Sequence, residues 1–183
     1  MKDYILIKPD DSYADEIASY RDEFANNLDE LGGSGALRTI DDPIMWIKLT
    51  KLMEDKDKLS LNVVPATQFI FVRCRDSKIV GTIQIRHYFN DYLQVYGGNI
   101  GYSIRPSERG KGYGSAMLRE CLKHCRRYGL DRVLITCEEH NIASRKVIIS
   151  NGGKYECTVY EPDENIYLER YWVDIEIINN QKE

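Results

Sequence analysis

The sequence predicts a single domain, residues 1–183, of the α/β (α+β) class. Three features predict it: short runs of alternating or continuous apolar residues, longer segments with apolar residues at helical spacing, and Gly- or Asp-rich breaks between them. A chain of 183 residues is long enough to bury a substantial core in one domain. The expected strands are residues 4–8, 68–74, 79–87, 100–104, 132–137, 155–160 and 166–175. The expected helices are residues 12–28, 43–53, 114–128 and 141–150.

The N-terminal part predicts a strand followed by a helix. Residues 4–8 alternate apolar and polar side chains, as a half-buried strand does. Asp11 and Ser12 offer a cap for a helix that continues through Leu28. The glycine-rich residues 32–35 then end this helix.

Residues 42–98 predict a second helix and then a hairpin. Asp42 and Pro43 begin this helix, with proline at the first position, where it is well tolerated. Residues 76–78 form a tight turn between two strands. Residues 90–98 are expected to form a loop with exposed aromatic side chains.

Strands and helices alternate in the second half of the chain. Gly129 stops a helix that begins at Gly114. Residues 132–137 form a short apolar run, as expected in a sheet covered on both faces. A further helix over residues 141–150 ends before two glycines, and residues 161–165 form the turn of a closing hairpin.

The composition excludes several classes of protein. A net charge of −4 argues against a nucleic-acid partner, because such partners usually demand a basic face. No apolar run approaches the roughly 20 residues that span a bilayer, and the start of the chain lacks the apolar core of a signal peptide. The cysteines and histidines show no ligand spacing, and Cys121 and Cys125 are expected to be small core residues. We therefore expect a cytoplasmic protein without a metal and without a membrane partner.

A glycine-rich stretch lies where a predicted strand passes into a helix. Gly110, Gly112 and Gly114 let the backbone approach a ligand closely and place several N–H groups on one concave side. The first turn of the helix adds unpaired N–H donors and a positive dipole end, which suit a pyrophosphate. Arg109 and Lys111 supply positive charge beside it.

Two well-known phosphate loops do not match this stretch. A P-loop needs Gly, four residues and then Gly-Lys-Ser/Thr, and the dinucleotide motif needs a glycine where Ser115 stands. The pattern that fits is Arg/Gln-x-x-Gly-x-Gly/Ala, filled by Arg109, Gly112 and Gly114. It resembles the acyl-coenzyme A pyrophosphate loop of the GCN5-related N-acetyltransferases, the GNAT family.

The resemblance extends over nearly the whole chain. Residues 141–144, Asn-Ile-Ala-Ser, resemble the family's Asn-x-x-Ala/Ser helix start. The order of elements is similar to the GNAT fold, a mixed, mostly antiparallel sheet of six to seven strands with helices on both faces. Within the family the chain looks closest to uncharacterised predicted acetyltransferases, on residues 100–106, 141–148 and 170–172.

This resemblance implies an acetyl-coenzyme A (acetyl-CoA) site and no metal. The strand backbone would pair with the pantetheine amides, the glycine-loop N–H groups would hold the pyrophosphate, and Asn141 would bond the pantetheine arm besides capping its helix. The implied cofactor-binding residues are Tyr102, Ser103, Ile104, Arg109, Gly110, Lys111, Gly112, Tyr113, Gly114, Ser115, Asn141 and Ser144.

The chain departs from the family at two proton-handling places. Ile148 stands where many members carry a tyrosine acid, and Thr136 stands where many carry a glutamate base. Glu138 projects to the same side of the strand as Thr136, so it could act as the base through a water. His87 is the alternative base, because the ordinary pKa of a histidine side chain lies close to neutral pH. Cys137 is expected to be an inert core thiol.

The sequence says less about the residues that bind the amine acceptor. In this fold the junction of the first two helices usually shapes the acceptor pocket, which points to residues 31–39 as a mobile lid or as a disordered connector. Tyr92 and Gly97-Gly98 would border the same cleft. The expected function is acetyl transfer from acetyl-CoA to a primary amine of a small molecule or peptide. The alternative is an inactive acyl-CoA-binding sensor or partner protein, and the sequence leaves a homodimer open.

Overall fold

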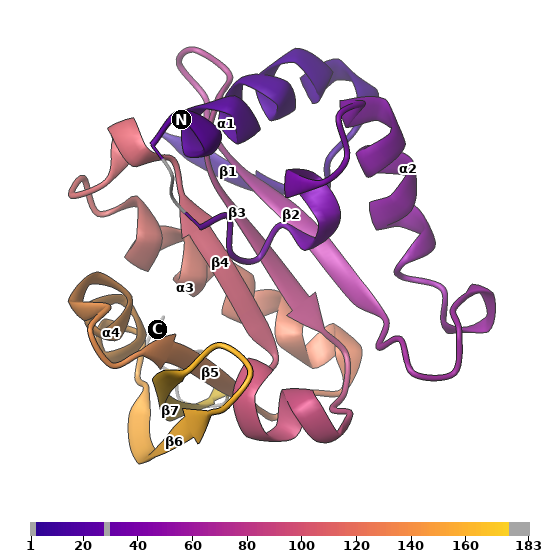
Figure 1. Cartoon of the computed structure of the whole chain (residues 1–183). Coiled ribbons are helices and arrows are strands. Elements are labelled where there is room, and N and C mark those ends of the chain that lie inside the picture. Colours follow the sequence, from indigo (N-terminus) through magenta and orange to yellow (C-terminus); the bar gives the residue numbers. More distant parts are fainter. Residues whose placement is uncertain (1–2, 28–29, 176–183) are drawn as a thin grey trace.

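The computed structural model describes residues 3–27 and 30–175. Seven strands form one sheet in the order β1-β2-β3-β4-β5-β7-β6 (Figure 1). The strands are β1 (Tyr4–Ile7), β2 (Ala66–Arg73), β3 (Lys78–Arg86), β4 (Ile100–Ile104), β5 (Arg132–Glu138), β6 (Lys154–Glu161) and β7 (Ile166–Asp174). The α-helices are α1 (Ala14–Asn26), α2 (Pro43–Leu52), α3 (Tyr113–Cys125) and α4 (Ile142–Ser150).

Every pair of neighbouring strands is antiparallel except β4 and β5, which are parallel. Those two strands share one register pair, Ile100 with Ile135. The start of β4 therefore meets the middle of β5, and the two strands separate toward their C-terminal ends. The mixed, mostly antiparallel sheet expected from the sequence is confirmed, with seven strands. The separation of β4 and β5 interrupts the sheet next to the glycine-rich stretch.

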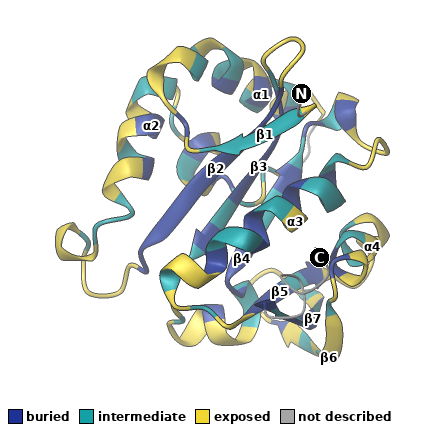
Figure 2. Ribbon diagram, turned by 180° about the vertical axis from the view of Figure 1, so that it is seen from behind, coloured by how far each residue is buried: buried dark blue, intermediate teal, exposed yellow. Residues whose placement is uncertain are grey.

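Helices cover both faces of the sheet. Helices α1 and α2 lie on one face, and Figure 2 shows α3 and α4 on the other. On the α1/α2 face the core contains Tyr20, Phe24 and Trp46, each at most 2% exposed. On the α3/α4 face Cys121 and Cys125 are fully buried, as expected.

Several elements differ in their details from the sequence-based expectation. Asp10, rather than Asp11 or Ser12, caps the first turn, because its carboxylate accepts from the backbone N–H of Ser12 at 2.9 Å. Leu28, expected within the first helix, lies outside the described residues. Residues 90–98 are not a plain loop, because Leu93–Gly97 forms a single π-helical turn, η4.

The segment over residues 31–39 packs onto the domain. The carbonyl of Gly33 accepts a hydrogen bond from the Gln68 side chain at 2.9 Å, and the carbonyl of Ser34 accepts one from Trp46 Nε1 at 2.8 Å. Leu37 is 1% exposed. These contacts disfavour the expected disordered connector, and they tie the junction of α1 and α2 to the face of the sheet.

Candidate active site

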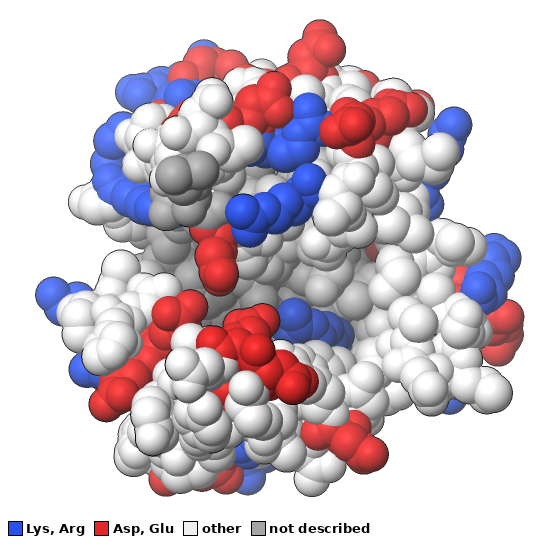
Figure 3. All heavy atoms as spheres, in the orientation of Figure 1, with Lys and Arg blue, Asp and Glu red and all other residues white. Residues whose placement is uncertain are grey.

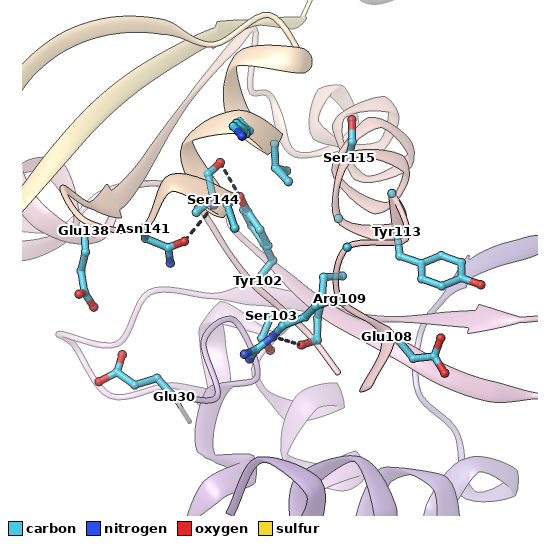
Figure 4. A pocket seen from close by; sticks show the side chains of 17 residues that line it. Glu30, Tyr102, Ser103, Glu108, Arg109, Tyr113, Ser115, Glu138, Asn141 and Ser144 are labelled. Atoms are coloured by element: carbon cyan, nitrogen blue, oxygen red, sulfur yellow. Dashed lines mark hydrogen bonds between the residues drawn. The ribbon is translucent and has the colours of Figure 1, made fainter. Parts of the chain in front are cut away.

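A cavity of about 640 Å³ lies where β4 and β5 separate (Figure 4). Eleven of the twelve predicted cofactor-binding residues line it, together with Glu138. The full lining is Glu30, Tyr102, Ser103, Ile104, Glu108, Arg109, Gly110, Gly112, Tyr113, Gly114, Ser115, Glu138, Asn141, Ala143, Ser144, Lys146 and Val147. The structure thus brings the glycine-rich stretch, the β4 strand and the start of α4 around one space.

The edge of β4 that faces β5 carries backbone groups that point into the gap. Hydrogen bonds from Arg105 N to Val80 O (2.9 Å) and from Arg86 N to Asn99 O (2.8 Å) fix the ladder between β3 and β4. Because such bonds alternate along an antiparallel pair, Ser103 directs its N–H and C=O toward β3. Tyr102 and Ile104 direct theirs toward β5.

The expected pairing with pantetheine therefore fits two of the three residues. Tyr102 and Ile104 present backbone groups to the cavity, whereas the Ser103 carbonyl is used by the ladder and also accepts from the Tyr20 hydroxyl at 3.0 Å. The Ile104 carbonyl accepts from Arg109 Nε at 3.2 Å, which holds the Arg109 side chain beside the strand (Figure 4).

The glycine-rich stretch forms a concave cradle at the start of α3. Gly110 and Gly112 have φ angles of 75° and 82°, in the left-handed region that favours glycine. A Cβ built on either residue would meet no protein atom within 4 Å, so the space in front of them is open. Helix α3 begins at Tyr113, and its first-turn N–H groups have no intrahelical partner. The cradle therefore fits a pyrophosphate.

A buried carboxylate, Glu108, holds this cradle from behind. Its side chain is 5% exposed and pairs with Arg73 at 2.8 Å, Lys111 at 2.9 Å and Lys78 at 3.3 Å. Burial by itself raises the pKa of Glu108, but hydrogen bonds from Lys111, Arg73 and Lys78 outweigh it and lower the pKa to about 2. Glu108 is therefore a buried residue rather than a surface one, although its sequence position beside the glycines favours the surface. Lys111, expected to bind the cofactor, instead bonds Glu108 and the Ser107 carbonyl and does not line the cavity.

We expect Glu108→Gln to destabilise the protein by about 3 kcal/mol at pH 7, because it removes the buried carboxylate that Arg73, Lys78 and Lys111 share. The folded-state pKa lies below the ordinary value of 4.5, so the ion pairs stabilise the fold above about pH 4.5 and are lost as the pH falls toward 2. Urea unfolding of both proteins should show their difference shrinking across that range. A difference that stays constant with pH would contradict this role.

The start of α4 brings a second set of polar groups to the cavity. Asn141 caps the helix through its side-chain oxygen, which accepts from the backbone N–H of Ser144 at 2.9 Å. Within the described residues its Nδ2 makes no hydrogen bond, so the amide donor remains available to a ligand. The Tyr102 hydroxyl bonds Ser144 Oγ at 2.8 Å, and burial raises the pKa of Tyr102 above its usual value.

Asn141 can therefore cap its helix and bind a ligand at once. We expect Asn141→Asp to keep most of the cap, because the remaining oxygen still accepts from Ser144, while CoA binding weakens by about 10-fold through the lost donor and the added charge. Calorimetry with CoA and a thermal melt of the same variant measure the two effects. Lower stability with unchanged CoA affinity would leave Asn141 as a helix cap only.

The two catalytic candidates occupy different places. Glu138, at the end of β5, is exposed and lines the cavity. His87 does not line it, because its ring stacks on Tyr128 at 4.3 Å and bonds Thr67 Oγ1 at 2.9 Å. Burial lowers the pKa of His87. The geometry therefore favours Glu138 and gives His87 a packing role.

The side chains at the two positions where many family members carry a tyrosine acid and a glutamate base have structural roles here. Ile148 is fully buried in the core, and Thr136 Oγ1 bonds the Tyr96 carbonyl at 2.7 Å. Cys137 is 6% exposed, and burial raises the pKa of its thiol to about 11, as expected for an inert core thiol.

Several lining residues were not predicted from the sequence. Glu30 reaches the cavity from the segment before α2, and Lys146 and Val147 reach it from α4. Spacing on α4 from Ala143 could have indicated the last two, since residues three to four apart share a helix face. Glu30 carries no such signal, because it lies in an irregular segment.

The fold and the site together define an acyl-CoA-binding domain, and a sequence comparison gives its family. A family model for the acetyltransferase (GNAT) domain matches residues 7–154. The chain therefore belongs to the GNAT acetyltransferase family, as an N-acetyltransferase that uses acetyl-CoA. No curated protein sequence matches the chain significantly.

Solved structures share the fold over nearly the whole chain. The ribosomal-protein-S5-alanine acetyltransferase of Vibrio fischeri has a TM-score of 0.70 at 19% identity and covers 96% of this chain and 95% of that chain. The microcin C7 self-immunity acetyltransferase MccE, in complex with acetyl-CoA and AMP, has a TM-score of 0.70 at 17% identity, with 95% and 93% covered. The spermidine/spermine N-acetyltransferase SpeG of Vibrio cholerae has a TM-score of 0.67 at 13% identity, with 99% of both chains covered.

Among the described residues, no helix is long and apolar enough to cross a membrane. In the same part of the chain, no group of three or more His, Cys, Asp and Glu side chains gathers as metal ligands would.

Proposed function

We propose that the chain transfers the acetyl group of acetyl-CoA directly to a primary amine of a small molecule or peptide. The observation that carries this proposal is the cavity between β4 and β5, which joins the phosphate cradle to the exposed carboxylate of Glu138. We take residues 1–183 as one catalytic domain, and the free cysteines favour a reducing, cytoplasmic setting.

The proposed reaction needs a positioned thioester and a route for the two protons that the acceptor nitrogen loses. The backbone groups of Tyr102 and Ile104 hold the pantetheine arm, and the thioester lies beside Tyr102. Glu138 accepts the first proton from the acceptor ammonium through a water, and the amine nitrogen then attacks the thioester carbonyl. As the carbon–sulfur bond breaks, the CoA sulfur leaves as a thiolate, and the second proton of the nitrogen passes through solvent to this thiolate.

The hydroxyl pair of Tyr102 and Ser144 is the proton source nearest the sulfur in this arrangement. The two hydroxyls bond one another at 2.8 Å and line the cavity. A thiolate leaves readily at neutral pH, since a free thiol has a pKa near about 8.5. The missing tyrosine at Ile148 is therefore compatible with transfer.

Thiol release from acetyl-CoA tests the proposal against a panel of L-amino acids, peptides with free N-termini, aminoglycosides and polyamines. Acetyl-CoA should be consumed with at least one of these amines, and mass spectrometry should find the acetylated product. Tight CoA binding without any transfer would favour the alternative, an inactive acyl-CoA-binding protein.

A further inference from the structure

A polar groove crosses the α1/α2 face of the sheet at the point where β4 and β5 meet. Side chains alternate along a strand, and Ile83 and Ile85 of β3 belong to the core on the α3 side. Gln84 and Arg86 therefore face the α1/α2 side, as do Thr136 and Glu138 of β5. Figure 3 shows this face hollowed, with basic atoms on the floor of the hollow and acidic side chains around its rim.

Arg86 is a cation on this face of the sheet. Its Nη1 donates to the carbonyls of Gly97 (2.5 Å) and Gly98 (3.1 Å) in and after the turn η4. A Cβ built on Gly101 would lie 3.3 Å from its Nη2 and 3.2 Å from the Cα of Gly33. The guanidinium therefore lies over the backbone of β4, one residue before Tyr102.

The charge of Arg86 is not neutralised within the described residues. None of their carboxylates forms an ion pair with it, and its Nε and Nη2 make no hydrogen bond there. No buried side-chain nitrogen or oxygen in that part of the chain lacks a partner, so these two atoms must reach solvent. Burial lowers the pKa of Arg86, as expected for a cation without a counter-ion.

A second arginine shows that a side chain can bind the turn η4 while its charge is neutralised by a carboxylate. Arg170 donates to the carbonyls of Gln94 and Val95 in η4, and it is neutralised by Glu156 at 2.7 Å. Arg86 binds the same turn without such a partner. Its two remaining donors, side by side on a planar group, match the two oxygens of a carboxylate.

We propose that Arg86 binds a carboxylate of the acceptor, so that the substrate is an α-amino acid or a compound that carries one. This inference rests on the proposed function and names the substrate class of that same site. The acceptor molecule would bind with its carboxylate on Arg86 and with its amine nitrogen directed toward the gap between β4 and β5.

The spacing along the strands agrees with such a substrate. Because Ile100 pairs with Ile135, Gly101 lies level with Thr136, and Ser103 lies level with Glu138. The Arg86 guanidinium lies over Gly101, which is two strand residues before the level of Glu138. Two strand residues correspond to a rise of about 7 Å. An α-amino group held by its carboxylate at Gly101 would therefore lie near Tyr102, one water away from Glu138.

The rim of the groove favours an acceptor that also carries an amine. Burial and then the charges of Glu161 and Glu164, from the β6–β7 hairpin, raise the pKa of Tyr92, and the charge of Arg86 acts on it in the opposite direction. Glu30 and Glu138 lie at the same end of the cavity in Figure 4, away from Glu108 and Tyr113. Acidic groups beside a buried cation suit a zwitterion better than a simple anion or a polyamine.

The test compares acceptors that differ only in the carboxylate. Acetyl transfer is measured for a set of L-amino acids and for their α-carboxamides, with kcat/KM expressed per unprotonated amine because the two amines differ in pKa. The wild type should prefer at least one acid over its amide by about 10²-fold. Arg86→Gln should remove that preference, lowering kcat/KM for the acid about 10²-fold and for the amide less than about 3-fold. The KM for acetyl-CoA should not change.

Three further variants separate recognition from a structural role. Arg86→Lys keeps the charge and should keep part of the preference for the acid. Arg170→Gln, which loosens the same turn, should lower the melting temperature and affect acid and amide equally. Arg75→Gln, on the exposed turn after β2, should change neither.

Equal rates for acids and amides, an equal loss of both in Arg86→Gln, or transfer to polyamines and peptides with no amino acid accepted would each overturn the carboxylate proposal while the proposed acetyl transfer stands. No transfer to any amine would overturn both.

Discussion

Gly112→Glu is expected to weaken CoA binding by several kcal/mol, or about 10³-fold. Gly112 has a φ of 82° at the N-cap of α3, and the space beyond its Cα is open to the cavity. A glutamate there would fill the cradle and bring a carboxylate against the pyrophosphate, so steric exclusion and like-charge repulsion act together. Isothermal titration of the folded variant with CoA measures the loss.

The chain offers a matched control for the backbone strain. Gly129 has a φ of 73°, and a Cβ built on it also meets nothing within 4 Å, but it lies after α3 and does not line the cavity. Gly129→Glu should therefore cost similar stability and leave CoA binding unchanged. If both variants bind CoA as the wild type does, the cradle is not the pyrophosphate site.

Local sequence patterns predicted the parts of the site that depend on the backbone. The positive φ angles of Gly110 and Gly112 can be read from residue type alone, because few other residues adopt them. The residue type of Asn141 likewise predicts a helix start, because its side-chain oxygen caps the helix that follows it. The mixed, mostly antiparallel sheet followed from the order of elements and the family resemblance, whereas the parallel contact of β4 with β5 is seen only in the structure.

Long-range contacts decided the features that sequence patterns missed. Lys111 resembles a phosphate ligand in sequence, but its ammonium turns to Glu108, which Arg73 and Lys78 reach from other elements. Whether an arginine such as Arg86 has a carboxylate partner depends on which elements pack around it. The hydrophobic periodicity of a sequence does not predict such long-range pairs.

His87 illustrates the same limit for catalysis. A histidine at the end of a strand has a suitable pKa class for a base, and only the packing of Tyr128 and Thr67 shows that its ring is already engaged. Glu138 was recognised from the family's base position at Thr136 together with strand alternation, because a shift of two residues keeps a side chain on the same face. Side-chain direction was thus predictable, and side-chain neighbours were not.

Glu138→Gln is expected to lower kcat/KM for an accepted amine by about 10²-fold or more, within the usual range for general-base catalysis. The substitution keeps the size of the side chain and removes its ability to take a proton. An alkyl ammonium with a pKa near about 10 must lose a proton before it attacks, so the loss should shrink as the pH approaches that value. Binding of acetyl-CoA should change little, because the cradle lies at the other end of the cavity (Figure 4).

A neighbouring carboxylate provides the control for this prediction. Glu139 is exposed, follows Glu138 directly and does not line the cavity, so Glu139→Gln removes the same charge from the same surface without touching the reaction. Full pH–rate profiles of the two variants then separate a proton-accepting role from a general effect of charge on a cationic acceptor. If Glu138 acts only by charge, both profiles fall together at every pH and respond to salt. If it takes the proton, only the Glu138→Gln profile falls, and it rejoins the wild type at high pH. A Glu138→Gln profile that overlays the wild type would show that the acceptor loses its proton to solvent before it binds.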